Sequence, residues 1–270
     1  MKPVAYQLIR QLDLPGVIAG LQTDESCKVI AGGQSLGAML NLRLARPSTL
    51  IDLDGIADLR RAELSGSDLV LGAMVTHARI EDGEVPDVTA GMLPRVARGI
   101  AYRAVRNRGT VGGSLCHADP AADWASALAA AGAFCELQGP QGTRAVPAAR
   151  FMVSAFEPDL QPGEILARIR VPAFGAGARW TYRKHCRKTG EFALAIVAGL
   201  RDPARGVERI VFGALDGPPC VIERAGLYDG LAQEAGRLAL LDEAGLAGAP
   251  RRALHADLLA AAAADMGVRT

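Results

Sequence analysis

The chain has 270 residues, of which 50% are hydrophobic and 22% charged, a composition typical of a globular protein with a core of its own. Lys and Arg number 30 and Asp and Glu 29, and this net charge of +1 gives no reason to expect nucleic acid or a membrane surface as partner. No run approaches the roughly 18 apolar residues of a transmembrane helix, and the N-terminus has no signal-peptide core, so we expect no transmembrane segment and a cytoplasmic protein.

The cysteines are Cys27, Cys116, Cys135, Cys186 and Cys220, and the two that lie nearest in sequence are 19 residues apart. Zinc and iron–sulfur sites usually draw their ligands from closely spaced cysteines. We therefore expect reduced thiols and neither a metal site nor an iron–sulfur cluster on this chain.

The N-terminal pattern predicts a small βα unit. Apolar spacing indicates a helix over 14–21 and a buried strand over 27–31 that ends at Gly32 and Gly33. Ser35 is expected to cap a helix over 36–42, and residues 49–53 indicate another strand. Helices and strands that alternate in this way favour a mixed fold.

A different pattern begins near residue 64. We expect strands over 69–73, 133–137 and 165–171, helices over 76–81, 90–101 and 123–131, a glycine turn over 110–114 and a hairpin turn over 138–142. Residues 173–177 are the best candidate linker, and beyond them we expect antiparallel strands over 193–200 and 209–215, then helices. This predicts one domain over 1–175, with subdomains of about 1–55 and 56–175, and a second over 176–270.

Two glycine segments are candidates for a diphosphate site. Residues 31–36 lie between a strand and a helix, where glycine lets backbone N–H groups approach a ligand and the helix start favours an anion. Residues 110–114 repeat this logic and are followed by two carboxylates, Asp119 and Asp123. The alternatives are plain turns, with Asp123 capping the next helix. Neither segment matches a Rossmann fingerprint or a P-loop.

These segments resemble one known family. AGGQSL at 31–36, LRLARP at 42–47 and LIDL at 50–53 look like the first FAD segment of the medium subunits of carbon monoxide dehydrogenase and xanthine dehydrogenase. RNRGTVGGS at 106–114, which runs into HADPAAD at 117–123, looks like the second. PGEIL at 162–166 and the stretch from YRK at 182–184 to GEFA at 190–193 resemble later segments.

The resemblance implies an α+β fold: a two-subdomain FAD-binding domain of the para-cresol methylhydroxylase type, then a small α+β C-terminal domain. It implies FAD on this chain. The residues themselves show no acid–base or nucleophilic constellation for a substrate, so we expect no catalytic residue. Positions that touch FAD in relatives are held here by Val29, Ile30, Ala31, Gly32, Gly33, Gln34, Ser35, Leu36, Ile100, Thr110, Val111, Gly112, Gly113, Ser114, Asp123, Leu166 and Lys184. His117 stands where a relative approaches the flavin ring, and Phe192 replaces a Tyr that some relatives place near it.

The same resemblance implies a hetero-oligomer, expected to be a dimer of heterotrimers. A small subunit would carry 2Fe–2S clusters and a large subunit the molybdopterin cofactor. This chain would be the electron-transfer flavoprotein of a molybdenum hydroxylase and pass electrons to an external acceptor. The alternatives are a free-standing FAD-dependent oxidoreductase with its own small substrate, and an interaction protein with a vestigial flavin pocket. Lys184 lies in a basic run that is either a solvated face or a cation beside the flavin.

Overall fold

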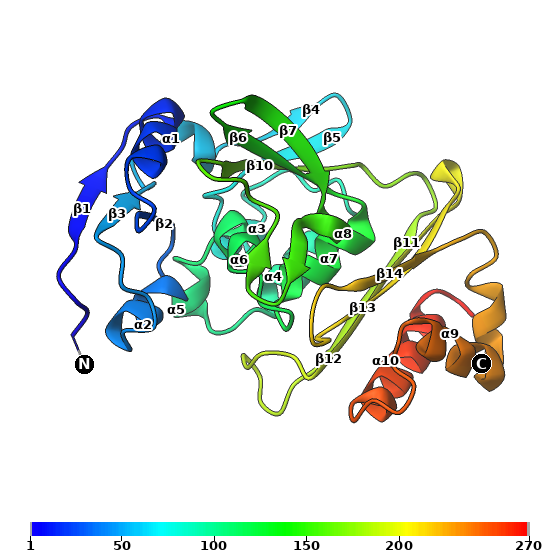
Figure 1. Ribbon diagram of the computed structural model, residues 1–270. Coiled ribbons are helices and arrows are strands. Elements are labelled where there is room, and N and C mark those ends of the chain that lie inside the picture. Colours follow the sequence, from blue (N-terminus) through cyan, green and yellow to red (C-terminus); the bar gives the residue numbers. More distant parts are fainter. Residues whose placement is uncertain (1, 269–270) are drawn as a thin grey trace.

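The computed structural model describes residues 2–268, and its main sheets follow one another along the chain (Figure 1). The first unit runs β1 (Gln7–Arg10), α1 (Leu14–Thr23), β2 (Lys28–Ile30), α2 (Leu36–Asn41) and β3 (Thr49–Asp52). Its strands are parallel in the order β1-β3-β2. Asp13 starts α1, because its Oδ1 accepts the N–H of Gly16 at 2.8 Å.

The second unit is built on an antiparallel sheet in the order β4-β5-β10-β6-β7. Its strands are β4 (Ala62–Ser65), β5 (Asp68–Gly72), β6 (Phe134–Gly139), β7 (Gly142–Pro147) and β10 (Ile165–Val171). Between β5 and β6 come α3 (His77–Glu81), α4 (Met92–Arg98), α5 (Arg103–Arg106), α6 (Val111–His117) and α7 (Asp123–Ala131). Between β7 and β10 come α8 (Ala148–Phe151), β8 (Met152–Ser154) and β9 (Glu157–Pro158). The sheet and these helices enclose the largest core, around the fully buried Trp124.

The third unit is an antiparallel meander followed by helices. It contains β11 (Arg179–His185), β12 (Ala195–Asp202), β13 (Val207–Gly213), β14 (Cys220–Glu223), α9 (Glu234–Glu243) and α10 (Arg252–Asp265). Short 3-10 helices cover Ala57–Arg60, Pro203–Arg205 and Asp229–Ala232.

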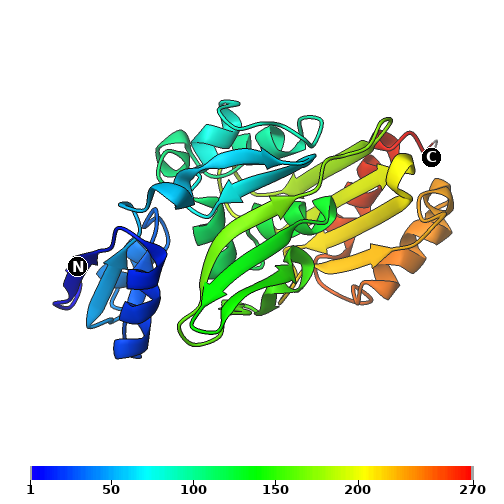
Figure 2. The ribbon, with the colours of Figure 1, turned by 90° about the horizontal axis from the view of Figure 1, so that it is seen from above.

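Both faces of the four-stranded sheet are covered, which explains why β12 is apolar almost throughout. Successive strand residues point to opposite faces. Val197 belongs to the core under the C-terminal helices, whereas Ala198 belongs to the large core that contains α7. The C-terminal sheet is therefore packed directly on the middle unit, while the N-terminal unit lies at the opposite end of the molecule (Figure 2).

The structure confirms the predicted α+β class and most of the predicted elements, including α7 and β10 at the expected residues. Ser35 stands directly before α2 as predicted, but the expected capping bond is wrong: Ser35 has helical backbone angles and its side chain makes no capping hydrogen bond. The division into domains at residues 55 and 175 stays a prediction. The first sheet ends at residue 52 and the second begins at 62; the second ends at 171 and the third begins at 179. Among residues 2–268, no helix combines the length and the apolar character needed to cross a bilayer.

Candidate functional site

The first glycine segment presents a run of free backbone donors. Gly33 has φ +72°, which turns the chain from β2 into α2. No acceptor among the described residues takes the N–H groups of residues 32–36, although the Gln34 side chain donates to the Gly32 carbonyl at 3.1 Å. Successive free N–H groups at a helix start form a concave site for an anion such as a phosphate.

The second glycine segment is different, because residues 111–114 are the first turn of helix α6 and not the expected turn. Its N–H groups are used inside the protein: Val111 donates to the Val75 carbonyl and Gly112 to the Ala73 carbonyl, each at 3.0 Å. The N–H of Gly113 donates to Oγ1 of Thr110 at 3.0 Å, which is an N-cap bond. The Ser114 hydroxyl makes no hydrogen bond within residues 2–268, so this segment offers a hydroxyl and not a row of amides.

Gly32 lets the first segment lie against the chain that leads into the second segment. A Cβ on Gly32 would overlap the carbonyl group of Arg108, 2.6 Å from its carbon and 3.0 Å from Cα of Gly109. A Cβ on Gly113 would lie 3.5 Å from Cβ of Ala31. Residues far apart in sequence thus lie side by side, and α2 is next to α5 in Figure 1.

A buried polar cluster joins α7 to the C-terminal sheet. Lys184 of β11 donates from Nζ to Oδ1 of Asp123 at 2.8 Å and to the Gly99 carbonyl at 2.8 Å. The Tyr182 hydroxyl donates to the same Asp123 oxygen at 2.7 Å. Burial, and after it the charge of Asp123, raises the pKa of Tyr182 well above its ordinary value, so the phenol stays a donor.

This cluster corrects two alternatives drawn from the sequence. Asp123 does not cap α7. Ala122 occupies the N-cap position, Asp123 is the first residue of the helix, and its carboxylate binds Lys184 instead. Lys184 is not part of a solvated face, because only 13% of its side chain is exposed. Its charge is balanced by Asp123, so the pair as a whole adds little net positive potential at the site.

The other predicted contacts occupy varied positions. Ile100 is half-buried in the loop between α4 and α5, while the side chains of Val111 and Leu166 are enclosed in the large core. His117 ends α6 with its ring centroid 5.4 Å from that of Phe156. Phe192 is 62% exposed in the loop after β11. Within residues 2–268, no three His, Cys, Asp or Glu side chains form a group that could hold a metal ion.

Tyr182 and the Gly99 carbonyl are site features that the sequence analysis missed. The signal for Tyr182 was available, because residues two apart on a strand share a face and Lys184 was already a candidate. Finding it required residues 179–185 to be predicted as a strand, and their dense positive charge concealed it.

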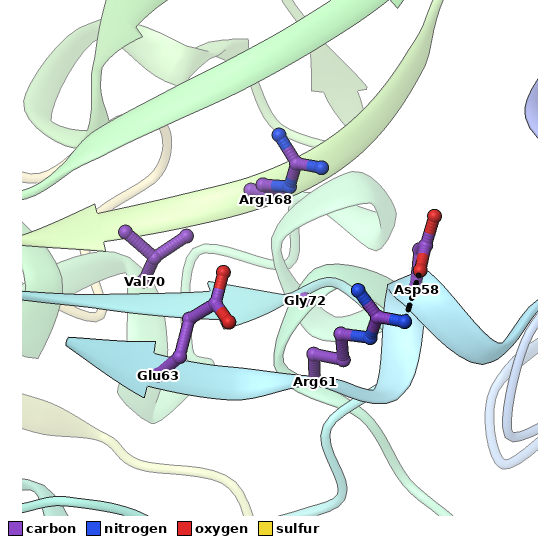
Figure 3. Close-up of a pocket in the computed structure, with 6 residues that line it drawn as sticks. All are labelled: Asp58, Arg61, Glu63, Val70, Gly72 and Arg168. Carbon is purple, nitrogen blue, oxygen red and sulfur yellow. Dashed lines mark ion pairs between the residues drawn. The ribbon is translucent and has the colours of Figure 1, made fainter. Parts of the chain in front are cut away.

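Two hollows lie apart from the glycine segments. The first holds about 20 Å³, enough for roughly one water, and is lined by Asp58, Arg61, Glu63, Val70, Gly72 and Arg168 (Figure 3). The second holds about 400 Å³, a volume typical of small-molecule sites. It is lined by Ala121, Arg251 and residues 187 and 190–194 of the loop after β11. Neither contains a residue of the predicted diphosphate site.

Comparison with known proteins identifies the class. The family model described as "FAD binding domain in molybdopterin dehydrogenase" matches residues 4–174. The chain belongs to this family, which confirms the resemblance seen in the sequence: it is an oxidoreductase subunit whose cofactor is FAD, of the medium-subunit type found in molybdenum hydroxylases.

Individual relatives agree with this class. The chain is 36% identical to the carbon monoxide dehydrogenase medium chain of Hydrogenophaga pseudoflava, over 76% of this chain and 72% of the relative. It is 31% identical to the caffeine dehydrogenase subunit beta of Pseudomonas sp. (strain CBB1), over 81% and 76%. Among solved structures, carbon monoxide dehydrogenase from H. pseudoflava that lacks the Mo-pyranopterin moiety gives a TM-score of 0.87 at 29% identity, covering 99% of this chain and 98% of that chain. Quinoline 2-oxidoreductase from Pseudomonas putida 86 gives 0.82 at 31% identity, with both chains fully covered.

Proposed function

We propose that this chain is an electron-transfer flavoprotein that takes electrons from iron–sulfur clusters of a partner subunit and passes them to an external acceptor. The observation that carries the proposal is the close approach of the two glycine segments, one with free N–H groups at residues 32–36 and the other with the free Ser114 hydroxyl. A diphosphate suits it, because it supplies several anionic acceptors at once.

The chain's own residues then hold the cofactor in place. The amides of residues 32–36 and the Ser114 hydroxyl bind the diphosphate, while Ile100, His117 and the Asp123–Lys184 pair lie toward the flavin. The remaining proposed contacts are Val29, Ile30, Ala31, Thr110, Val111, Gly112, Gly113 and Leu166. When bound, FAD accepts two electrons and releases them singly or together, which suits a link between one-electron clusters and a two-electron acceptor.

The proposed assembly contains a small iron–sulfur subunit and a large subunit with the molybdopterin cofactor, arranged as a dimer of heterotrimers in the cytoplasm. The family supports this assignment, since the relatives are named as medium chains or subunits of dehydrogenases. Substrate oxidation would take place on the large subunit, and this chain would complete the path of the electrons.

Rapid-mixing kinetics test the direction of electron flow. Substrate of the molybdenum subunit is mixed with the whole complex and, separately, with this chain loaded with FAD. We expect flavin reduction only in the whole complex, after reduction of the clusters. Flavin reduction in the isolated chain by a small organic substrate would instead support a free-standing oxidoreductase, and a chain that takes up no FAD would support a vestigial pocket.

A further inference from the structure

The loop between α4 and α5 is held by cations at three successive carbonyls. Lys184 Nζ donates to the carbonyl of Gly99 at 2.8 Å. Arg106 donates from one guanidinium nitrogen to the carbonyl of Ile100 at 2.8 Å and to that of Ala101 at 3.1 Å. We call residues 99–101 the carbonyl loop.

The loop is strained as well as clamped. Ala101 has φ +41°, in the left-handed region that a residue with a Cβ rarely adopts. Such a conformation persists only where the surroundings enforce it. The two hydrogen bonds from Arg106 go to the carbonyls on either side of the Ala101 α-carbon. They therefore hold this backbone in its strained conformation.

Arg106 is itself fixed on its other side. It forms a two-pronged pair with Glu81, in which Nε lies 2.7 Å from one carboxylate oxygen and a terminal nitrogen 3.1 Å from the other. Only 11% of the Arg106 side chain and 12% of the Glu81 side chain are exposed. Burial strengthens such a pair and holds the planar guanidinium in one orientation.

Two parts of the C-terminal region also meet the carbonyl loop. Lys184 belongs to β11, and Gly190 belongs to the loop after β11. A Cβ on Gly190 would lie 3.1 Å from the carbonyl oxygen of Ala101. The carbonyl loop, which contains the proposed flavin contact Ile100, is therefore contacted by both α5 and the C-terminal sheet.

We propose that Arg106 is a positioning residue for the flavin site: anchored by Glu81, it holds the strained carbonyl loop in the shape that directs Ile100 toward the flavin. This inference rests on the proposed FAD contact at Ile100. It also assigns a role to the first arginine of the RNRG sequence, which lies beside the glycine segment but points inward and not to a phosphate.

Arg103→Met is the matched control for Arg106→Met. Arg103 lies on the same helix and pairs with Glu81 and Asp82, but it donates to no carbonyl of the loop, and 49% of its side chain is exposed. The variants are made in the whole complex, purified through a tag on this chain. FAD affinity and the visible circular dichroism of the bound flavin are measured for each.

We expect Arg106→Met to weaken FAD binding about 10-fold or more, by analogy with the loss of a residue that orients a metal ligand, and to change the flavin dichroism. Arg103→Met should change neither. Equal losses of FAD affinity in both variants would overturn the proposal, because they would come from the pairing with Glu81, which both arginines share, and not from the carbonyl loop. If wild-type protein binds no FAD, the proposed function fails and not merely this inference.

Two further variants keep the test decisive if Arg106→Met does not fold. Arg106→Lys retains the charge beside Glu81 but cannot reach the loop with a second planar donor, so it should fold and still show the altered dichroism. Adding Ala101→Gly to Arg106→Lys should restore part of the FAD affinity, because glycine adopts positive φ without strain. Normal dichroism in Arg106→Lys, or no rescue by Ala101→Gly, would refute the positioning role.

Discussion

Replacing Gly32 with alanine should separate the two glycine segments and release FAD. The new Cβ would lie 2.6 Å from the carbonyl carbon of Arg108, whereas carbon atoms in contact sit about 3.5 Å apart. The Arg108 carbonyl must therefore retreat by at least about 1 Å, because its oxygen lies even closer to the new Cβ than its carbon does. Because it is a backbone group at the start of the turn that leads to Thr110, this movement shifts the second segment away from the first.

The cost has two parts. Overpacking of this kind destabilises a protein by about 1–3 kcal/mol, which lowers the melting temperature of a chain of this size by about 2–10 °C. FAD binding should fall further, because the diphosphate site loses the alignment of its two walls. Flavin released by acid is measured per chain, and thermal unfolding is followed by circular dichroism.

Gly37→Ala provides the matched control, since it adds the same methyl group five residues later. A Cβ there meets nothing within 4 Å, so the fold and the FAD content should both be unchanged. A Gly32→Ala protein that melts normally and holds a full complement of FAD would refute the reasoning. Equal loss of FAD in Gly37→Ala would show that the close approach at Gly32 is not the cause.

Three other changes have defined outcomes. Lys184→Met leaves the buried Asp123 without its cation and should cost about 3–5 kcal/mol in urea unfolding, whereas Arg183→Met, at a more exposed pair, should cost about 1 kcal/mol or less; equal costs would contradict the buried-pair argument. Burial, and after it the charge of Arg106, lowers the pKa of His77 to about 4, so the folded protein resists protonation and loses stability as pH falls from 6.5 to 4. His77→Gln should remove about 3 kcal/mol of that loss, and an unchanged acid slope in thermal melts would count against it. Gly33→Val places a β-branched residue at φ +72° and should abolish FAD binding while far-ultraviolet dichroism persists; retained flavin would mean that this segment is only a turn.

Much of the fold follows from local signals in the sequence. Helix α7 and strand β10 begin and end where apolar periodicity and flanking residues predict, because both are buried and their patterns are strong. Strand β11 was missed, since four of its seven residues are basic or histidine, and a charged strand has no apolar alternation to reveal it. Edge strand β1 was missed for a related reason, as its residues are mostly exposed.

Some features of the candidate site could be predicted from local sequence, and others depend on the tertiary fold. The first glycine segment could be predicted, because a strand, a glycine turn and a helix start are local features. The use of the α6 amides by Val75 and Ala73 could not, since those carbonyls belong to a different stretch of chain that only the tertiary fold brings near. The carbonyl loop could not be predicted either. Its strained residue is an alanine, which gives no sign of positive φ, and the cations that bind it come from α5 and β11.

The cofactor content of the natively expressed complex tests the central claim most directly. The chain is purified under native conditions through a tag, and flavin, iron, molybdenum and molar mass by light scattering are measured on the same sample. We predict about one non-covalent FAD per chain, together with iron and molybdenum in a hetero-oligomer. A lone monomer of 28.2 kDa that is full of FAD and oxidises a small substrate without other chains would contradict the account.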